Sequence, residues 1–215
     1  MFPKRAPAVL RSVLKGTTWS LPNERERVFI TFDDGPIPGV TPWVLDTLQA
    51  YGAKATFFCI GRNAKANPDI LERITAEGHG VGNHTWDHMR GWGTRAFTYA
   101  RQALRTDAVL PKDGPRLFRP PYGRITPRQA RMLATRYRIV MWDVLSADFD
   151  PGRTGEACTR TVIRNTRPGS IIVFHDSLKA EPRLRHALPL VLDHLKRTGL
   201  RCASLQDPSI SFGSR

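Results

Sequence analysis

Short apolar runs alternate along this chain with longer segments of helical pattern, and this alternation limits the folds that the chain can adopt. Seven runs have the length and composition of buried parallel strands, namely 28–32, 55–60, 80–84, 117–119, 138–144, 170–175 and 200–205. Helices are expected between them over 43–52, 70–78, 94–109, 126–135, 155–166 and 187–198. Strict alternation favours a parallel sheet covered by helices. We therefore predict an α/β fold, a single-domain distorted (β/α) barrel of about seven parallel strands with outer helices.

Three helix starts share one signature, in which a residue that can cap a helix stands directly before a proline. Thr41, Asn67 and Thr126 each occupy such a position. Proline suits the first helical turn because that turn does not need its N–H, and a Thr or Asn side chain can accept a hydrogen bond from the free N–H groups there. These three residues are therefore predicted N-caps.

The ends of the chain differ from its middle. Residues 1–27 are predicted to form an extension to a domain over 28–205, with a tail over 206–215. If 9–15 is helical, Val9, Leu10, Val13 and Leu14 fall on one face, flanked by Lys4, Arg5, Arg11 and Lys15. Such a helix could touch an anionic membrane or pack on its own domain. No apolar stretch has the length of a signal sequence or a membrane span, so we expect a cytoplasmic protein, at most peripheral to a membrane.

The chain is strongly basic, with a formal net charge of +14. A surface of this sign attracts polyanions, phosphate-bearing lipids or acidic glycans, although the excess of Arg over Lys could also reflect a bias in residue usage. No basic run is interleaved with stacking aromatic residues, so nucleic acid is not an expected partner. The three cysteines, Cys59, Cys158 and Cys202, cannot all pair and lack metal-ligand spacing, which favours a reducing compartment.

Polar side chains stand at the ends of several predicted strands. They are Asp33 and Asp34, His84, Arg119, Asp143 and His175. In a parallel barrel the carboxyl ends of the strands form one rim, and active sites are built there. Scattered structural residues would have no reason to choose that rim, so we expect these side chains to form a site.

The residue types at this rim favour a metal site. Asp33 and Asp34 follow the run 28–32, and His84 and His88 have a spacing that brings two imidazoles to one side of a helical turn or tight loop. One carboxylate and two imidazoles suit Zn²⁺ and leave open positions, while the second carboxylate could act as a base. The pattern predicts a metal-dependent hydrolase; ordinary loop or core histidines are the alternative.

Five ordered segments resemble the motifs of the polysaccharide deacetylases, carbohydrate esterase family 4. They are Thr31-Phe32-Asp33-Asp34-Gly35-Pro36, His84-Thr85-Trp86-Asp87-His88, Arg119-Pro120-Pro121-Tyr122-Gly123, Trp142-Asp143 to Asp148, and Ile172-Val173-Phe174-His175-Asp176. The likeness extends over residues 28–205, which would be the catalytic domain. It implies a distorted barrel of seven strands that holds one divalent metal and removes N-acetyl or O-acetyl groups from sugars.

The resemblance also implies a role for each matching residue. The metal, commonly Zn²⁺ with Co²⁺, Ni²⁺ or Mn²⁺ as alternatives, would be held by Asp34, His84 and His88. Asp33 would be the base for the metal-bound water that attacks the acyl carbon, and Arg119 would orient Asp33. His175 would be the acid that protonates the departing amine, a step that is typically worth about 10² to 10⁴ in rate.

Substrate contacts follow from the same motifs. Tyr122 matches the position whose backbone N–H stabilises the oxyanion, and Val173 matches the position that lines the pocket for the acetyl methyl group. Trp142, like Trp86 and Trp92, could present its ring to a sugar or pack in the interior.

The fourth motif departs from the family at one position. Leu145 stands where the family usually has the Asp that tunes the acid histidine. The partner of His175 is therefore open between Asp143, Asp148 and none. Asp148 matches the second acid of the motif, so it ranks first and is expected near the substrate.

Three functions fit these residues. The first is N-deacetylation, by a monomer, of an N-acetylated sugar in a glycan or lipid-linked saccharide. The second is O-deacetylation or deformylation by the same metal site. The third is carbohydrate binding by a barrel that has lost catalysis, because of Leu145.

Overall fold

The computed structural model describes residue 14 and residues 16–212. The strands are β1 (Thr17–Thr18), β2 (Arg27–Asp33), β3 (Thr56–Cys59), β4 (Gly80–Asn83), β5 (Leu117–Phe118), β6 (Arg138–Val140), β7 (Val144–Leu145), β8 (Ile171–His175) and β9 (Arg201–Cys202). The helices are α2 (Thr41–Ala50), α3 (Gly61–Ala66), α4 (Pro68–Ala76), α5 (Ala96–Asp107), α6 (Pro127–Ala134), α7 (Gly155–Asn165) and α8 (Glu181–Arg197), and a 3₁₀ turn covers Pro121–Gly123. Apart from the buried Leu14, the predicted helix at 9–15 lies outside the described residues. Within the described part, no helix has both the length and the apolar character needed to cross a bilayer.

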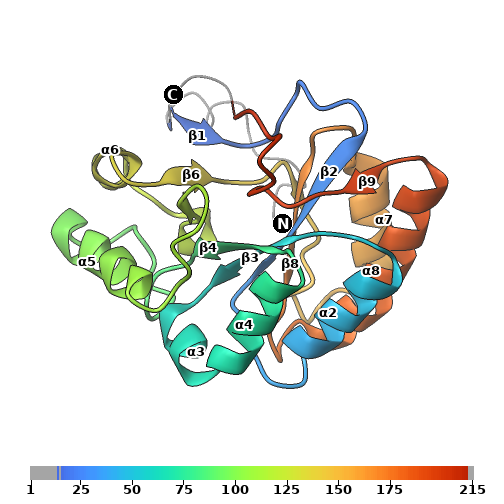
Figure 1. Cartoon of the computed structure of the whole chain (residues 1–215), viewed down its shortest axis with the longest axis horizontal. Coiled ribbons are helices and arrows are strands. Elements are labelled where there is room, and N and C mark those ends of the chain that lie inside the picture. Colours follow the sequence, from blue (N-terminus) through green and yellow to red (C-terminus); the bar gives the residue numbers. More distant parts are fainter. Residues whose placement is uncertain (1–13, 15, 213–215) are drawn as a thin grey trace.

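The strands form a parallel sheet that curls into an incomplete barrel. Its order is β1-β6-β5-β4-β3-β2-β8-β7, and β9 pairs with the start of β2. The pairs between named strands are parallel. Helices surround the sheet (Figure 1). The predicted α/β barrel with outer helices is confirmed, and it stays open where β1 and β7 end the order of neighbours.

The run predicted as one strand, 138–144, is two strands with different partners. β6 lies between β1 and β5, whereas β7 pairs with β8. Between them the N–H of Met141 bonds to Thr18 at 2.7 Å and that of Asp143 bonds to Ile171 at 3.2 Å. A strand has only two edges, and both edges of β6 are occupied. The chain must therefore bend before it can pair with β8, and the prediction of one strand was wrong here.

Only one of the three predicted caps acts as a cap. Thr126 forms a capping box with Gln129, in which each side chain bonds to the backbone N–H of the other. α2 instead begins at Thr41, whose hydroxyl donates to Asp176 at 2.6 Å. The Asn67 amide makes no cap and donates to the Pro36 and Asn63 carbonyls. Thr41 and Asn67 thus stabilise the loop that follows β2 rather than their helices.

Two helices differ from expectation because of packing. α8 begins at Glu181 instead of 187 and continues through Pro189. Its buried Leu184, Leu188 and Leu192 lie on one face, and burial of that face outweighs the hydrogen bond that the proline removes. α3 was not predicted, because its sequence has no apolar periodicity to mark it.

The two faces of β2 explain how the site is positioned. The core cluster that includes residues of α2 and α8 takes Val28, Ile30 and Phe32 from β2. Phe29, on the opposite face, belongs to a separate cluster with residues of β3, β5 and β8. Side chains alternate along a strand, so Thr31 and Asp33 share the face of Phe29 and point into the barrel at its carboxyl end.

Candidate active site

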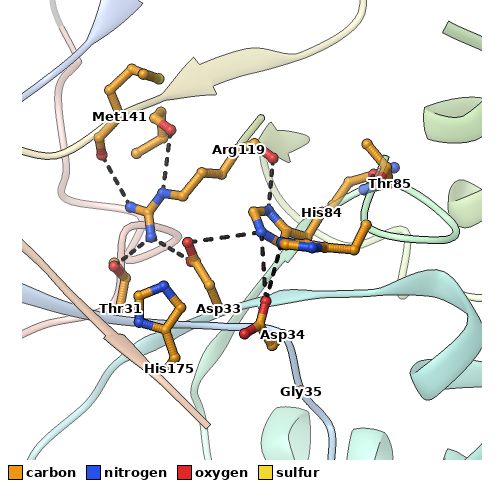
Figure 2. A network of polar contacts seen from close by, with 12 residues as sticks. Thr31, Asp33, Asp34, Gly35, His84, Thr85, Arg119, Met141 and His175 are labelled. Atoms are coloured by element: carbon orange, nitrogen blue, oxygen red, sulfur yellow. Dashed lines mark hydrogen bonds and ion pairs between the residues drawn. The ribbon is translucent and has the colours of Figure 1, made fainter. Parts of the chain in front are cut away.

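The predicted site residues meet at the carboxyl rim of the barrel. Asp33 ends β2 and is in register with His175, the last residue of β8. Asp34 follows β2, His84 follows β4 and Arg119 follows β5. Figure 2 shows these side chains converging from separate strands. Asp143 is the exception, because it precedes β7 and bonds to Ser170 and Ile171 at the start of β8. Its predicted position at the rim was wrong.

Asp34, His84 and His88 form a cluster whose ligand atoms lie within 4.8 Å of one another. Asp34 Oδ1 is 3.3 Å from His88 Nε2 and 4.0 Å from His84 Nε2. This oxygen is buried and accepts no hydrogen bond from the described residues. A buried carboxylate oxygen without a donor is costly unless a cation compensates its charge, so the cluster fits a divalent metal.

The protonation of His84 suits this purpose. Its Nδ1 lies 2.8 Å from the carbonyl oxygen of Arg119, which can only accept, so Nδ1 carries the hydrogen. The lone pair of Nε2 then faces Asp34 (Figure 2). Burial lowers the pKa of His84 to about 4 and also lowers the pKa of His88. Both imidazoles are therefore neutral at neutral pH, which is the form that binds metals.

Left-handed backbone conformations concentrate in the loops that build the site. The non-glycine residues with positive φ among the described residues are Asp34, Thr85, His88, Tyr122 and Ala147. Side chains cost energy in this region of φ, and surrounding contacts must offset that cost. Thr85 is fixed in this way, since its N–H bonds to Asn83 and its hydroxyl accepts the N–H of Met89.

The loop that carries Asp34 is clamped by residues that the sequence did not identify. Asp176 accepts the N–H of Gly35 at 3.0 Å and the hydroxyl of Thr41 at 2.6 Å. Asn63 donates to the carbonyl of Asp34 at 2.7 Å. A Cβ on Gly35 would lie 1.9 Å from an oxygen of Asp176, so only glycine fits. Asp176 ends the fifth of the family motifs, directly after His175, but the sequence did not assign it this role.

Asp33 is fixed by a fully buried arginine. Arg119 donates through one terminal nitrogen to Asp33 Oδ1 at 2.7 Å and to the Thr31 hydroxyl at 2.6 Å. Its other nitrogens reach the carbonyls of Met141 and Val140. Burial would raise the pKa of Asp33, but the positive charge of Arg119 and the nearby imidazoles outweigh burial and lower it. Asp33 is therefore ionised, with Oδ2 left free of Arg119.

His175 has a buried acid as its partner. Asp148 Oδ1 lies 2.8 Å from His175 Nδ1, and Oδ2 accepts the backbone N–H of His175 at 2.9 Å. Ser146 donates to the same Oδ1 at 2.9 Å. Asp143 is remote from this pair, so the open question of the histidine's partner is answered by Asp148. The rings of Phe149 and His175 pack edge to face, with their centroids 5.0 Å apart.

The candidate substrate residues differ widely in exposure. Tyr122 is 61% exposed, and its ring lies 4.5 Å from that of His88. Trp92 is 50% exposed. Trp86 is buried against Arg105, and Trp142 is half-buried against Gly123.

Val173 and Leu145 are neighbours in register on β8 and β7. Val173 is fully buried, two residues before His175 on the same face of the strand. Asp148 is also fully buried. The side chains of Val173 and Asp148 are therefore closed to a ligand in this structure. A substrate would contact His175 before it reached either of them.

The comparisons with known proteins agree with this geometry. A family model described as polysaccharide deacetylase matches residues 20–140. A peptidoglycan-N-acetylglucosamine deacetylase of Bacillus cereus is 35% identical over 192 residues, which cover 87% of this chain and 70% of that protein. The chain belongs to the polysaccharide deacetylase family. A chitooligosaccharide deacetylase of Azorhizobium caulinodans is 34% identical over 166 residues, 75% of this chain and 79% of that protein.

Solved structures of polysaccharide deacetylases share the fold. The crystal structure of the Bc1960 peptidoglycan N-acetylglucosamine deacetylase has a TM-score of 0.83 and 34% identity, and the match covers 88% of this chain and 91% of that one. A Bacillus anthracis protein described as a CE4 family pseudoenzyme has a TM-score of 0.76 at 23% identity, over 87% and 66% of the two chains. The fold alone therefore does not decide between catalysis and its loss, and the site residues must.

Proposed function

We propose that this chain is a metal-dependent hydrolase that removes N-acetyl groups from an N-acetylated sugar of a glycan or lipid-linked saccharide. One observation carries the proposal: Asp34 Oδ1 is buried, has no hydrogen-bond donor among the described residues, and faces the imidazoles of His84 and His88. The relatives named for peptidoglycan and chitooligosaccharide deacetylation support the substrate class.

The metal would be held by Asp34, His84 and His88. These ligand types favour Zn²⁺, with Co²⁺, Ni²⁺ or Mn²⁺ as alternatives. When bound, the ion would supply Lewis acidity toward a water molecule and the acyl oxygen.

Asp33 is the proposed general base. Its Oδ1 is committed to Arg119, so Oδ2 is the oxygen that can take a proton from the attacking water. The lowered pKa keeps Asp33 ionised at neutral pH, and the hydrogen bonds of Arg119 hold its orientation.

His175 is the proposed general acid. Its Nδ1 is engaged by Asp148, so Nε2 can donate a proton to the departing amine. The water oxygen first adds to the acyl carbon while Asp33 takes its proton. The carbon–nitrogen bond then breaks as His175 gives its proton to the nitrogen, so acetate and the free amine result. An amine must be protonated to leave, whereas a stabilised alkoxide needs this much less. The pairing of His175 with Asp148 therefore favours an amide over an ester.

Substrate would lie along the exposed side of the site. Tyr122 stands beside His88 and can border the substrate, with its backbone N–H as the proposed oxyanion donor. Trp92 offers a second exposed ring in the loop that follows His88. The ring of Trp142 is packed against Gly123. It would therefore border the substrate rather than stack on a sugar ring.

Acetate release from a chitooligosaccharide and from an aryl acetate ester, each with added Zn²⁺, tests the proposal. We expect amide hydrolysis that disappears in Asp33→Asn. Activity on the ester alone would replace the proposal by O-deacetylation. Sugar binding without either reaction, in a protein that has been shown to bind Zn²⁺, would replace it by the non-catalytic alternative.

A further inference from the structure

Two segments of this chain carry several arginines and no acidic residues. Residues 88–106 contain four arginines and residues 114–142 contain seven, and neither segment has an Asp or a Glu. These eleven arginines are one third of the 33 Lys and Arg residues of the chain. Residues 157–175 also lack acids and carry three arginines, so the two segments matter here because of where they lie in the fold.

The two segments lie side by side in the fold. The first contains α5 except its last residue, Asp107, and the second contains α6. Buried residues of both helices share one core cluster. The Gln129 amide on α6 donates to the carbonyls of Gly91 and Thr94, in the loop before α5. Figure 1 shows α5 and α6 on the same side of the molecule, away from α7 and α8. Their solvent side, which we call the α5–α6 face, includes Phe97, Arg101, Leu104, Arg128, Arg131 and Met132.

The arginines of this face have no acidic partners. Arg101, Arg128 and Arg131 are exposed, and none pairs with a carboxylate of the described residues. Arg116 and Arg136 differ, since both pair with Asp107 at the end of α5. The α5–α6 face therefore presents uncompensated positive charge to whatever approaches it.

The same face exposes apolar side chains. Phe97 is 70%, Leu104 49% and Met132 39% exposed. Phe97 and Leu104 are seven residues apart on α5, so they project from one side of the helix with Arg101 between them. Three of the seven large hydrophobic residues that are exposed in the described part of the chain therefore lie on this face. Such clustering marks an interaction surface more often than chance exposure does.

Exposed aromatic and aliphatic side chains among arginines, without acids, are typical of helices that lie at the surface of an anionic membrane. A sugar chain can stack on aromatic rings but gains little from Leu104 or Met132. We propose that the α5–α6 face docks on membranes that contain anionic lipids, with Phe97, Leu104 and Met132 among the headgroups.

Flotation of the purified full chain with lipid vesicles tests the proposal. We expect binding to phosphatidylcholine vesicles that contain phosphatidylglycerol, and none to phosphatidylcholine alone. Arg101→Glu with Arg128→Glu should weaken vesicle binding at least about tenfold. Each arginine near an anionic surface strengthens binding, and each glutamate is repelled by it. Arg25→Glu with Arg164→Glu changes the net charge equally at exposed positions outside both segments, and should stay within about twofold of the unaltered chain.

The apolar contribution needs its own pair of variants. Phe97→Ser with Leu104→Ser should weaken vesicle binding about tenfold or more, since two apolar side chains can no longer leave water. Leu190→Ser, on the 47% exposed position of α8, should leave binding unchanged. If the charge variants weaken binding and the serine variants do not, the face binds polyanions without insertion and the proposal fails. It also fails if face variants and controls behave alike. Vesicle binding is measured without a sugar, so its failure would leave the proposed hydrolysis untouched.

Discussion

Asp148 holds His175 at two points, accepting its ring Nδ1–H at 2.8 Å and its backbone N–H at 2.9 Å. Burial alone would lower the pKa of His175. The charge and hydrogen bond of Asp148, with the charges of Asp34 and Asp33, outweigh burial and raise the pKa to about 9. The imidazole is therefore protonated at neutral pH, as a general acid must be at the start of the reaction.

Replacing Asp148 by Asn should shift the pH dependence of catalysis. Without the carboxylate charge the pKa of His175 falls, so the protonated acid is lost at a lower pH. We expect the alkaline limb of kcat for an N-acetyl substrate to move about one to three pH units toward acid, measured by acetate release. Asp143→Asn removes an equally buried acid that bonds to Ser170 instead, and should leave the limb in place. An unmoved limb in Asp148→Asn would mean that this pair does not set the protonation of the acid.

The same pair should make stability depend on pH. The pKa of His175 is higher in the folded protein, at about 9, than the unfolded value of roughly 6.5. Its contribution to the free energy of unfolding is therefore complete below the unfolded pKa and is lost as the pH rises toward 9. We expect the Tm of metal-free protein to fall over this range, and to fall less in His175→Gln. Equal slopes in both proteins would assign the loss to other groups.

His175→Ala should separate amides from esters. An amide loses the proton donor for its leaving group, so kcat for an N-acetylated sugar should fall by about 10² to 10⁴. An aryl acetate has a good leaving group and should lose less than about tenfold. Both values come from acetate release by the same preparation of Zn²⁺-loaded protein. Equal losses on the two substrates would show that His175 supports another step, such as binding.

Asp34→Asn should abolish stabilisation by metal. A ligand at a hundredfold excess over its Kd stabilises a protein by about 2.7 kcal/mol, which corresponds to a rise in Tm of about 5 to 10 °C for a chain of this size. We expect that rise when Zn²⁺ is added to chelator-treated protein, and none in Asp34→Asn. Asp87→Asn is the control, since Asp87 lies between the two histidines in sequence but bonds to Gln102 at the surface. A full rise in Asp34→Asn would remove Asp34 from the metal site.

The sequence was sufficient at the ends of β2 and β8, where the site residue ends or follows an apolar run that forms a single strand, but not at Asp143, where the run divides into β6 and β7. The alternation along β2 determines which face Asp33 occupies, and His175 ends β8 in the same way. Arg119 could be assigned to the rim on the same argument, although β5 has only two residues. In each case the local pattern carries the information, because strand register is set by burial of one face.

The sequence was insufficient wherever a side chain acts through a distant segment. Thr31 accepts from Arg119, and Asp176 clamps Gly35, across long stretches of chain that no spacing rule connects. Thr41 was predicted as a cap because it stands directly before a proline at a helix start. That pattern does not reveal that its hydroxyl bonds to Asp176 instead of to the helix. The two-residue strand β1 has too few residues for any periodicity. Such features depend on the assembled tertiary structure.

Gly35 and Asp176 should behave as a coupled pair. A methyl group at position 35 would overlap the carboxylate of Asp176, with its Cβ 1.9 Å from the nearest oxygen and 2.6 Å from Cγ. Gly35→Ala must therefore displace the loop that carries Asp34, and we expect weaker Zn²⁺ binding by calorimetry as well as a lower Tm. Asp176→Gly alone loses the hydrogen bonds to Gly35 and Thr41 but removes the obstacle. The double variant should then lose less stability than the two single losses combined, by about 1 to 3 kcal/mol. Additive losses would mean that the loop avoids the overlap by moving elsewhere, and that Asp176 does not determine where Asp34 lies.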